Sequence, residues 1–438
     1  MTSTALPLDP LAKRLQTIQK LIATGKLPEA ATKLNAAIKA APADARVLLM
    51  GMRLAEASGN AAGAQDAARR AVKLAPQWSV AVTELAFLLA RQNQLKEAMV
   101  HAERAVELDG NNPEVLARVV DVAHRAQHFE LALAWLQRAA VVSPDNADIK
   151  RLLARDLRLT GQLDKAMAAY NALIEASSTD ALSLMGRAQT ALAGGNPALA
   201  LKDCDALLAL HPDNEEVLFY RDLALGNTPA RQPAAMIRSL YDGFAELYDQ
   251  HVVAGLKYKL PREVARIITE RYPGHTLNVL DLGCGTGLLG ACLGRIQGAL
   301  VGVELSPRMI DQAARHNVYD RFHNVDLLDA LEATPPSLYD VIAALDVFIY
   351  AGDMTAAIPQ AYAILRNGGH FIFSCESAGE GEADLVLRPS QRYAHKASHI
   401  ESLCRDAGFS EVLVEAMPLR YENNQPVGGF LVIGKKPA

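Results

Sequence analysis

Cysteine is scarce in this chain, which has five among 438 residues. Cys284, Cys292, Cys375 and Cys404 are widely spaced, and the sequence contains no C-x-x-C pair. Neither a zinc site nor a disulfide framework is therefore expected. We expect free, mostly buried thiols, with Cys204 on an inward position of a helix.

Long apolar runs and an excess of basic residues are also missing. No apolar stretch reaches membrane-spanning length, and residues 1–10 lack the basic start and apolar core of a signal peptide. A net charge of -5 argues against a general nucleic-acid binder. These features predict a cytoplasmic protein without a membrane partner. A content of 50% hydrophobic and 21% charged residues is ordinary for two or three packed domains.

The first half of the sequence has a strict internal period of 34 residues. Alanine recurs at this interval, at Ala30, Ala64, Ala98, Ala132, Ala166 and Ala200. Five residues before each alanine is a small or polar residue, at Gly25, Gly59, Asn93, Gln127, Gly161 and Gly195. Twelve residues after it come Pro42, Pro76, Gly110, Pro144, Ser178 and Pro212. This spacing predicts a helix, a tight turn and a second helix, with alanine where two backbones approach closely and proline where the second helix ends.

The pattern resembles the tetratricopeptide repeat over about residues 11–214. The family's bulky aromatic residue in the first helix is replaced here, for example by Val82 and Leu116, and Lys150 of the fifth repeat is the poorest match. The resemblance implies about six repeats stacked into a superhelix, whose concave face is lined by the first helix of each pair and holds a peptide or partner protein. The alternative is that the repeats only mediate assembly of an oligomer.

Arginines share one face of the first helix in the fifth repeat. Arg151, Arg155 and Arg158 are spaced i, i+4 and i+7, and Arg46 and Arg53 take equivalent places in the second repeat. They predict a basic groove suited to an acidic segment or a chain terminus. Alternatively these arginines are merely solvated, with Asp121, Asp148 and Asp156 neutralising part of the charge.

A domain boundary is expected after the repeats. Residues 215–225 read as a capping helix, and residues 226–233 contain Gly, Asn and two prolines, a composition typical of a linker. We therefore divide the chain into a flexible N-terminus at 1–10, a repeat domain at 11–228, a linker at 229–235 and a second domain at 236–438.

The second domain alternates strand and helix patterns. Short apolar runs at 278–282, 300–305, 341–345 and 370–374 are separated by helical segments such as 307–315 and 355–365. Alternation of this kind predicts an α/β domain with a doubly wound, mainly parallel sheet.

A glycine-rich loop follows the first of these strands. Its sequence, DLGCGTG at 281–287, lets the backbone turn tightly and bring bare amides against a ligand over a helix N-terminus. The dinucleotide fingerprint needs a further glycine where this chain has Leu288. Glu304 closes the second strand, 23 residues after Asp281, where a carboxylate can accept both hydroxyls of a ribose.

Five ordered segments resemble the class I S-adenosylmethionine-dependent methyltransferases over about residues 236–438. They read NVLDLGCGTG, VGVELS, VDLLDAL, YDVIAALDVFIY and AYAILRNGGHFIFS. The resemblance implies that S-adenosylmethionine is the cofactor, with Asp281 toward its ammonium group, Glu304 on the ribose and Asp326 reading the adenine. The full set of cofactor-binding residues that it implies is Asp281, Gly283, Cys284, Gly285, Glu304, Leu305, Asp326, Leu327 and Leu345. Segments 411–418 and 429–435 resemble the family's last two strands, one of them antiparallel to the rest.

Structural roles are the alternative for the acidic members of this set. Asp281 could merely cap the following turn, Glu304 could be a surface acid at a strand end, and Asp326 could pair with solvent. Asp329, three residues further on, could also take the place of Asp326.

Candidates on the acceptor side are fewer. An aromatic-rich segment, containing Tyr241, Phe244, Tyr248, Asp249 and Tyr258, resembles the family's N-terminal lid. The sequence RYAHK at 392–396 is expected in the loop after the fifth strand, where His395 could act as a base and Tyr393 could line the acceptor site. An inert loop histidine is the alternative. The fourth strand ends in LDVF. It lacks the Asn/Asp-Pro-Pro-aromatic tetrapeptide that resembles enzymes methylating planar amide or adenine nitrogens, which argues against such acceptors.

Three functions remain open from the sequence. The first is a methyltransferase whose repeats recognise a protein or peptide, and the second is a small-molecule methyltransferase whose repeats mediate assembly. The third is a non-catalytic adaptor that senses the cofactor.

Overall fold

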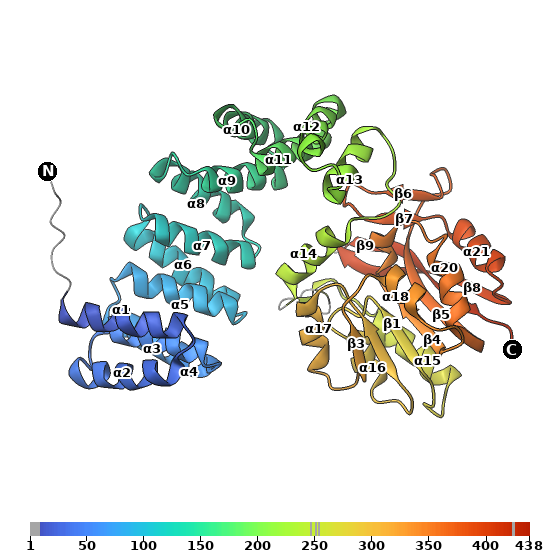
Figure 1. The fold of residues 1–438 in the computed structure, drawn as a ribbon, viewed down its shortest axis with the longest axis horizontal. Helices are drawn as coiled ribbons and strands as arrows, with labels where there is room; N and C mark the ends of the chain where they lie inside the picture. Colours follow the sequence, from blue (N-terminus) through green and yellow to red (C-terminus); the bar gives the residue numbers. More distant parts are fainter. Residues whose placement is uncertain (1–8, 246–247, 250–251, 253–254, 423–424) are drawn as a thin grey trace. The chain divides into compact units, whose positions relative to one another are not determined.

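The computed structural model describes residues 9–245, 248–249, 252, 255–422 and 425–438, without the side chain of Phe244. The chain forms two compact units, Met1–Asn196 and Pro197–Ala438, and each is described by itself (Figure 1). Most of the predicted flexible N-terminus lies outside the described residues. The predicted boundaries of the domains at 11–228 and 236–438 stay a proposal.

The first unit consists of helices that pair in sequence order. Its helices are α1 (Pro10–Ala23), α2 (Leu27–Ala40), α3 (Ala45–Ala57), α4 (Ala61–Leu74), α5 (Ser79–Arg91), α6 (Leu95–Asp109), α7 (Pro113–Arg125), α8 (Phe129–Val142), α9 (Ala147–Leu159), α10 (Leu163–Ala176) and α11 (Ala181–Ala193). The fifth repeat, whose sequence matches the family least well, forms the pair α9 and α10, although Lys150 is exposed. The predicted all-helical repeat fold is confirmed.

The 34-residue period corresponds to a repeated geometry. The six periodic alanines have no exposed surface, because each lies where helices pack closely. The six turn residues all have a positive φ, from 59° at Asn93 to 76° at Gly161, a conformation that glycine and asparagine adopt most easily. Helix α6, which has Gly110 where most repeats have proline, continues up to Asp109.

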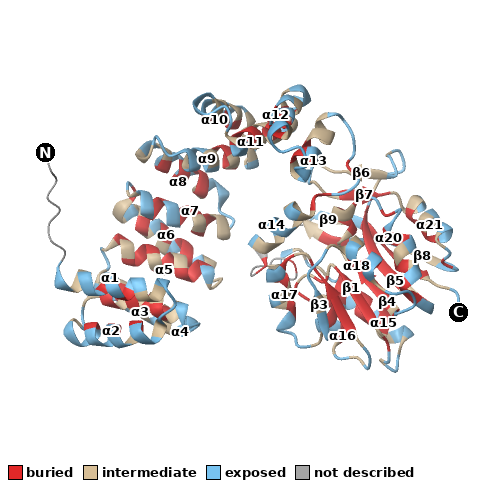
Figure 2. Ribbon diagram, in the orientation of Figure 1, coloured by how far each residue is buried: buried red, intermediate tan, exposed pale blue. Residues whose placement is uncertain are grey.

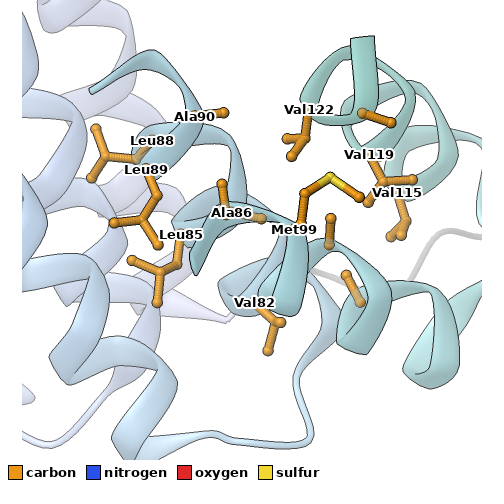
Figure 3. Packing of buried hydrophobic residues seen from close by; sticks show 14 of the residues in the cluster. Val82, Leu85, Ala86, Leu88, Leu89, Ala90, Met99, Val115, Val119 and Val122 are labelled. Atoms are coloured by element: carbon orange, nitrogen blue, oxygen red, sulfur yellow. The ribbon is translucent and has the colours of Figure 1, made fainter. Parts of the chain in front are cut away.

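Several apolar clusters hold the first unit together, and the most extensive of those described runs from α3 to α8. Figure 3 shows its centre, where Met99 of α6 lies next to Val119 of α7, and Leu85 and Leu89 extend from α5. Because each helix pair shares core residues with the next pair, the repeats stabilise one another.

The second unit contains two more helices of the repeat type and an α/β domain. Its helices are α12 (Pro197–Leu210), α13 (Glu215–Ala224), α14 (Ala234–Phe244), α15 (Leu260–Arg271), α16 (Leu288–Leu293), α17 (Pro307–Ala314), α18 (Leu327–Ala333), α19 (Phe348–Ala351), α20 (Ala357–Ile364) and α21 (Ala397–Asp406). Its strands are β1 (Val279–Leu282), β2 (Leu300–Val303), β3 (Arg321–His323), β4 (Tyr339–Ala344), β5 (Leu365–Ser377), β6 (Leu385–Leu387), β7 (Tyr393–His395), β8 (Glu411–Glu422) and β9 (Gln425–Lys435).

The sheet has the order β3-β2-β1-β4-β5-β7-β6, and β9 joins β5 and β8. Strands β1 to β5 are parallel, whereas β9 is antiparallel to β5. The predicted doubly wound sheet and its antiparallel member are confirmed. Strands β6 and β7 were not predicted, and they replace part of the expected loop after β5.

Alternate residues of the strands face opposite layers of helices. Leu280, Ile342 and Phe371 pack with α18, α20 and α21, whereas Val341 and Ile372 pack with α15 and α16. The central strands β1, β2 and β4 are therefore buried on both sides, as Figure 2 shows in red. The carboxyl ends of β1, β2 and β4 meet at one edge of the sheet, where ligands bind in open α/β folds.

The stretch before α14, expected to be a linker, packs against the α/β domain. We call residues 229–232 the connecting segment. The Tyr393 hydroxyl donates to the Pro229 carbonyl at 2.8 Å, and the amide of Asp353 donates to the Ala230 carbonyl at 2.7 Å. The amide of Gln232 donates to the Tyr350 carbonyl at 3.0 Å. These bonds attach the connecting segment to β7 and to the residues around α19.

Candidate functional site

The glycine-rich loop joins β1 to α16 in a left-handed backbone conformation. Gly283, Gly285 and Gly287 have φ values of 63°, 54° and 81°. A Cβ on Gly283 would lie 2.5 Å from Cγ2 of Val347, whereas one on Gly285 would meet no atom within 4 Å. The backbone at Gly285 therefore faces open space, so a ligand can approach it closely.

Glu304 follows the end of β2 and faces the loop. Its side chain accepts the amide of Gly285 at 3.0 Å through Oε2 and the amide of Ser306 at 2.8 Å through Oε1. Burial raises the pKa of Glu304, and the two amides oppose that shift. Each carboxylate oxygen keeps a further lone pair, so Glu304 can still accept hydroxyl groups from a ligand.

Asp281 is buried at the end of β1. Its Oδ2 accepts the hydroxyl of Tyr319 at 2.6 Å, and the same Tyr319 oxygen accepts the amide of Gly290 at 3.2 Å. Burial raises the pKa of Asp281 to about 7, while the Tyr319 hydroxyl acts in the opposite direction. Tyr319 precedes β3 and belongs to no motif, so no pattern in the sequence singles it out.

Asp326 is the N-cap of α18. Its Oδ1 accepts the amide of Leu328 at 2.9 Å and lies 3.6 Å from the guanidinium of Arg231 in the connecting segment. The next residue, Leu327, lines the cavity beside Glu304. Asp326 therefore has a structural role, and its predicted contact with an adenine stays a prediction.

Two adjoining cavities, which together we call the loop cavity, have volumes of about 80 and 40 Å³. They share four residues, including Gly283, Gly285 and Leu345. Seven of the nine predicted cofactor residues line them: Asp281, Gly283, Cys284, Gly285, Glu304, Leu327 and Leu345. Leu305 lies directly after Glu304, and its carbonyl accepts the side chain of Asn324 at 2.8 Å. The predicted set is thus largely gathered in one place.

A further cavity of about 150 Å³, the tyrosine cavity, adjoins the loop cavity. Tyr241, Tyr248, Asp346 and Tyr350 line both. The expected aromatic segment thus contributes to the site, although the side chain of Phe244 is outside the described part. Asp346 and Tyr350 were not predicted as site residues. Both lie in the segment LDVFIY after β4, which resembles the family as a whole segment but does not single out these two side chains.

Tyr393 and His395 are buried in β7 and not in a loop, which corrects their expected location. Tyr393 bonds to Pro229, and His395 Nε2 lies 2.6 Å from the carbonyl oxygen of Gly352. Burial lowers the pKa of His395. Among the described residues of this segment, Arg392 lines the tyrosine cavity. The contacts of Tyr393 and His395 with Pro229 and Gly352 are structural, and catalytic roles for the two side chains stay predictions.

The first unit has a groove of about 390 Å³. It is lined by residues of α3, α5 and α7, the first helices of successive pairs, as the repeat resemblance implies. Arg53 and Glu84 line it and form an ion pair at 3.1 Å. Arg118 of α7 also lines it and lies over the ring of Phe87, 4.1 Å from its centroid.

Most of the predicted groove arginines have acidic partners. Arg46 lies 2.7 Å from Asp9 and 2.8 Å from Asp44. Arg151 lies 2.7 Å from Asp180 and also contacts Asp148. Arg155 lies 3.1 Å from Asp156. Of the three acids expected to offset the charge, Asp148 and Asp156 do neutralise arginines of the fifth repeat, whereas Asp121 pairs with Arg125 at 2.7 Å.

Arg158 faces the phenol of Tyr170, whose pKa its charge lowers against the effect of burial. Of the five predicted arginines, Arg53 lines the 390 Å³ groove and the other four do not, so the groove is less basic than the sequence alone predicts.

Family models match both parts of the chain. The model described as a tetratricopeptide repeat matches residues 89–155, and the one described as a methyltransferase domain matches residues 280–371. The second range contains the glycine-rich loop, Glu304 and Asp346. The chain thus carries tetratricopeptide repeats and a methyltransferase domain.

Individual relatives match the methyltransferase part. Methyltransferase-like protein 27 of Homo sapiens is 34% identical over 133 residues, 30% of this chain and 53% of that protein. The ubiquinone biosynthesis O-methyltransferase of Xylella fastidiosa is 28% identical over 110 residues, 24% of this chain and 45% of that protein. The chain therefore spans about half the length of these two curated relatives.

Solved structures that align with parts of this chain include a methyltransferase and a tetratricopeptide-repeat protein. Magnesium protoporphyrin IX methyltransferase from Synechocystis with bound SAH aligns at 18% identity over 46% of this chain and 99% of that one, with a TM-score of 0.37. YrrB, a TPR protein with an unusual peptide-binding site, aligns at 21% identity over 43% and 97%, with a TM-score of 0.39. In the described part of the chain, no helix has the length and apolar character needed to cross a membrane.

Proposed function

We propose that the protein is an S-adenosylmethionine-dependent methyltransferase whose repeats recognise a protein or peptide. The observation that carries the proposal is the pairing of Glu304 with the amide of Gly285, which sets a ribose-binding carboxylate against an open glycine backbone. Leu327 and Leu345 add apolar surface to the same cavity. This combination suits a nucleoside with a polar tail.

The chain's own residues would hold the cofactor in defined ways. Glu304 would accept the ribose hydroxyls, and Asp281 would face the amino-acid end, where its contact with Tyr319 fixes the direction of the carboxylate. When bound, S-adenosylmethionine supplies a methyl group on a sulfonium: the acceptor's lone pair bonds to the methyl carbon while the carbon–sulfur bond breaks and its electron pair stays on sulfur. Tyr241, Tyr248 and Tyr350 would exclude water and position the acceptor, which can provide most of the rate enhancement.

Recognition of a protein by the repeats is the finer part of the proposal. It is supported by the 390 Å³ groove, in which Thr83, Asn112 and Glu114 provide polar groups beside Arg118. A peptide held there would make mixed polar and apolar contacts. The paired arginines favour a partner of balanced charge over a strongly acidic one.

The test is to incubate the purified protein with S-adenosylmethionine labelled in the methyl group and a cell lysate, and then to separate macromolecules from small metabolites. Label in a protein supports the proposal, whereas label only in metabolites favours a small-molecule enzyme whose repeats mediate assembly. Cofactor binding without any transfer of label favours the non-catalytic adaptor. A variant with Glu304→Ala serves as the control for label that enters without this site.

A further inference from the structure

The tyrosine cavity lies where a methyl acceptor would have to bind. Its shared boundary with the loop cavity consists of Tyr241, Tyr248, Tyr258, Asp346 and Tyr350. A molecule in the tyrosine cavity and a molecule in the loop cavity can therefore both contact these boundary side chains. The chemistry of this shared boundary then determines which acceptor is accommodated.

Asp346 is the carboxylate at this boundary. Its backbone is in the left-handed region, with φ 55°, and its amide donates to the Ser374 hydroxyl at 2.8 Å. The left-handed conformation costs energy for a residue other than glycine, and it directs the Asp346 side chain to the point where both cavities meet. Burial raises the pKa of Asp346, although the nearby Arg420 acts against this shift, so its carboxylate is a stronger base than an exposed one.

The charges around Asp346 leave one negative charge in excess. Arg420, 4% exposed, lies 3.2 Å from Asp346 and 2.9 Å from Glu422, and it also contacts Glu376. Arg392 contacts Glu422 and lies 4.0 Å from Glu376. Three carboxylates thus face two guanidinium groups, whose donors are directed at those carboxylates. The group therefore favours a cationic ligand over an anionic one.

Aromatic rings form much of the remaining wall. Tyr241 packs edge-to-face with Tyr248 and Tyr350, at centroid distances of 5.9 and 5.7 Å, and Tyr258 lines the cavity as well. Burial raises the pKa of Tyr241, Tyr248 and Tyr258, so the phenols stay neutral. The faces of neutral aromatic rings attract ammonium groups.

We infer that the tyrosine cavity binds an acceptor with an aliphatic amine on an apolar or aromatic body, and that Asp346 pairs with its ammonium group. This inference rests on the proposed methyltransferase function and names its acceptor class. Asp346 takes one proton from the ammonium and becomes a neutral carboxylic acid, and the nitrogen is left with a free lone pair. Tyr350 and Tyr241 hold the nitrogen at the boundary of the two cavities.

Calorimetric titration of the full chain without cofactor tests the inference with three probes of one shape: 2-phenylethylamine, 2-phenylethanol and phenylacetate. We expect the amine to bind at least tenfold more tightly than the alcohol, and phenylacetate to bind most weakly. Asp346→Asn should reduce the advantage of the amine to less than threefold. The matched control is Asp213→Asn, which makes the same change at an exposed residue that does not line the cavity; it should keep the preference.

Several results would overturn the inference. An amine that binds no better than the alcohol, or not at all, contradicts it, as does a preference that survives in Asp346→Asn. Tightest binding of phenylacetate would show that Arg392 or Arg420 governs the site. If Asp346→Asn does not fold, Tyr350→Leu replaces it, with a larger loss of affinity expected for the amine than for the alcohol. S-adenosylmethionine is titrated into the same samples. If the protein binds this cofactor but does not bind the amine more tightly than the alcohol, the acceptor class alone is rejected. If the protein does not bind the cofactor, the proposed function is rejected.

Discussion

Removing the connecting segment should destabilise the methyltransferase domain. The comparison is between a fragment of residues 226–438 and one of residues 236–438, which begins at the predicted domain start. The shorter fragment loses the hydrogen bonds to Tyr393, Asp353 and Tyr350. At roughly 0.5–1.5 kcal/mol for each bond, the loss is about 3 kcal/mol, which lowers the Tm of a domain of this size by roughly 6–12 °C.

Thermal unfolding followed by circular dichroism measures this difference, and Tyr393→Phe provides a control in both fragments. In the longer fragment the substitution removes the bond to Pro229 and should cost about 1 kcal/mol. In the shorter fragment the hydroxyl has already lost that partner, so the substitution should be neutral or stabilising. Equal Tm values for the two fragments, or an equal effect of Tyr393→Phe in both, would show that the connecting segment does not stabilise the domain.

Further predictions concern the loop and the repeats. Asp281→Asn should stabilise the cofactor-free protein at pH 8 but not at pH 4. The pKa of Asp281 in the folded protein, about 7, is above the unfolded value, so the wild type loses stability as the pH rises from about 4 to about 7. A Tm difference between variant and wild type that stays the same across this pH range would contradict the prediction. Gly283→Ala should lower the Tm and weaken cofactor binding, since φ is 63° and the new methyl group would clash with Val347. A variant with the wild-type Tm and the wild-type affinity for the cofactor would contradict this prediction. Arg151→Glu combined with Arg155→Glu should destabilise the repeats, because the new carboxylates would face the acids that pair with these arginines in the wild type. The corresponding double Gln variant should unfold nearer the wild-type temperature. A lower Tm for the Gln variant than for the Glu variant would count against these ion pairs.

The repeats could be predicted because their signals are local. An alanine at a close helix contact and a residue with positive φ at a tight turn are each required by the backbone at that position, so the 34-residue period shows directly in the sequence. The groove's charge could not be predicted in the same way. Arg151 pairs with Asp180, which lies in the next repeat, and only the folded array shows which acids reach which arginines.

Most of the lining of the loop cavity could be predicted from a loop and an acid in the right order, and Tyr241, Tyr248 and Tyr258 from an aromatic segment. Two further residues of the site could not be predicted. Tyr319 and Asp346 lie far from the loop in sequence and meet it only through the strand order of the sheet. The hairpin of β6 and β7 was missed because each strand has three residues, too few for a visible alternation. As a result, His395 and Tyr393 were expected in an open loop and are instead buried.

Calorimetric titration of the full-length protein with S-adenosylmethionine is the decisive test of the proposed cofactor site. We predict one site per chain and at least tenfold weaker binding for Glu304→Ala, because a charge-assisted hydrogen bond contributes roughly 1.5–3 kcal/mol. Asp320→Asn is the matched control: Asp320 also accepts a strand amide, that of Leu300 at 2.8 Å, but at the opposite end of β2, and it should bind like the wild type. A folded wild-type protein that does not bind S-adenosylmethionine, or Glu304→Ala binding with wild-type affinity, would contradict the assignment of Glu304 and the loop cavity to this cofactor.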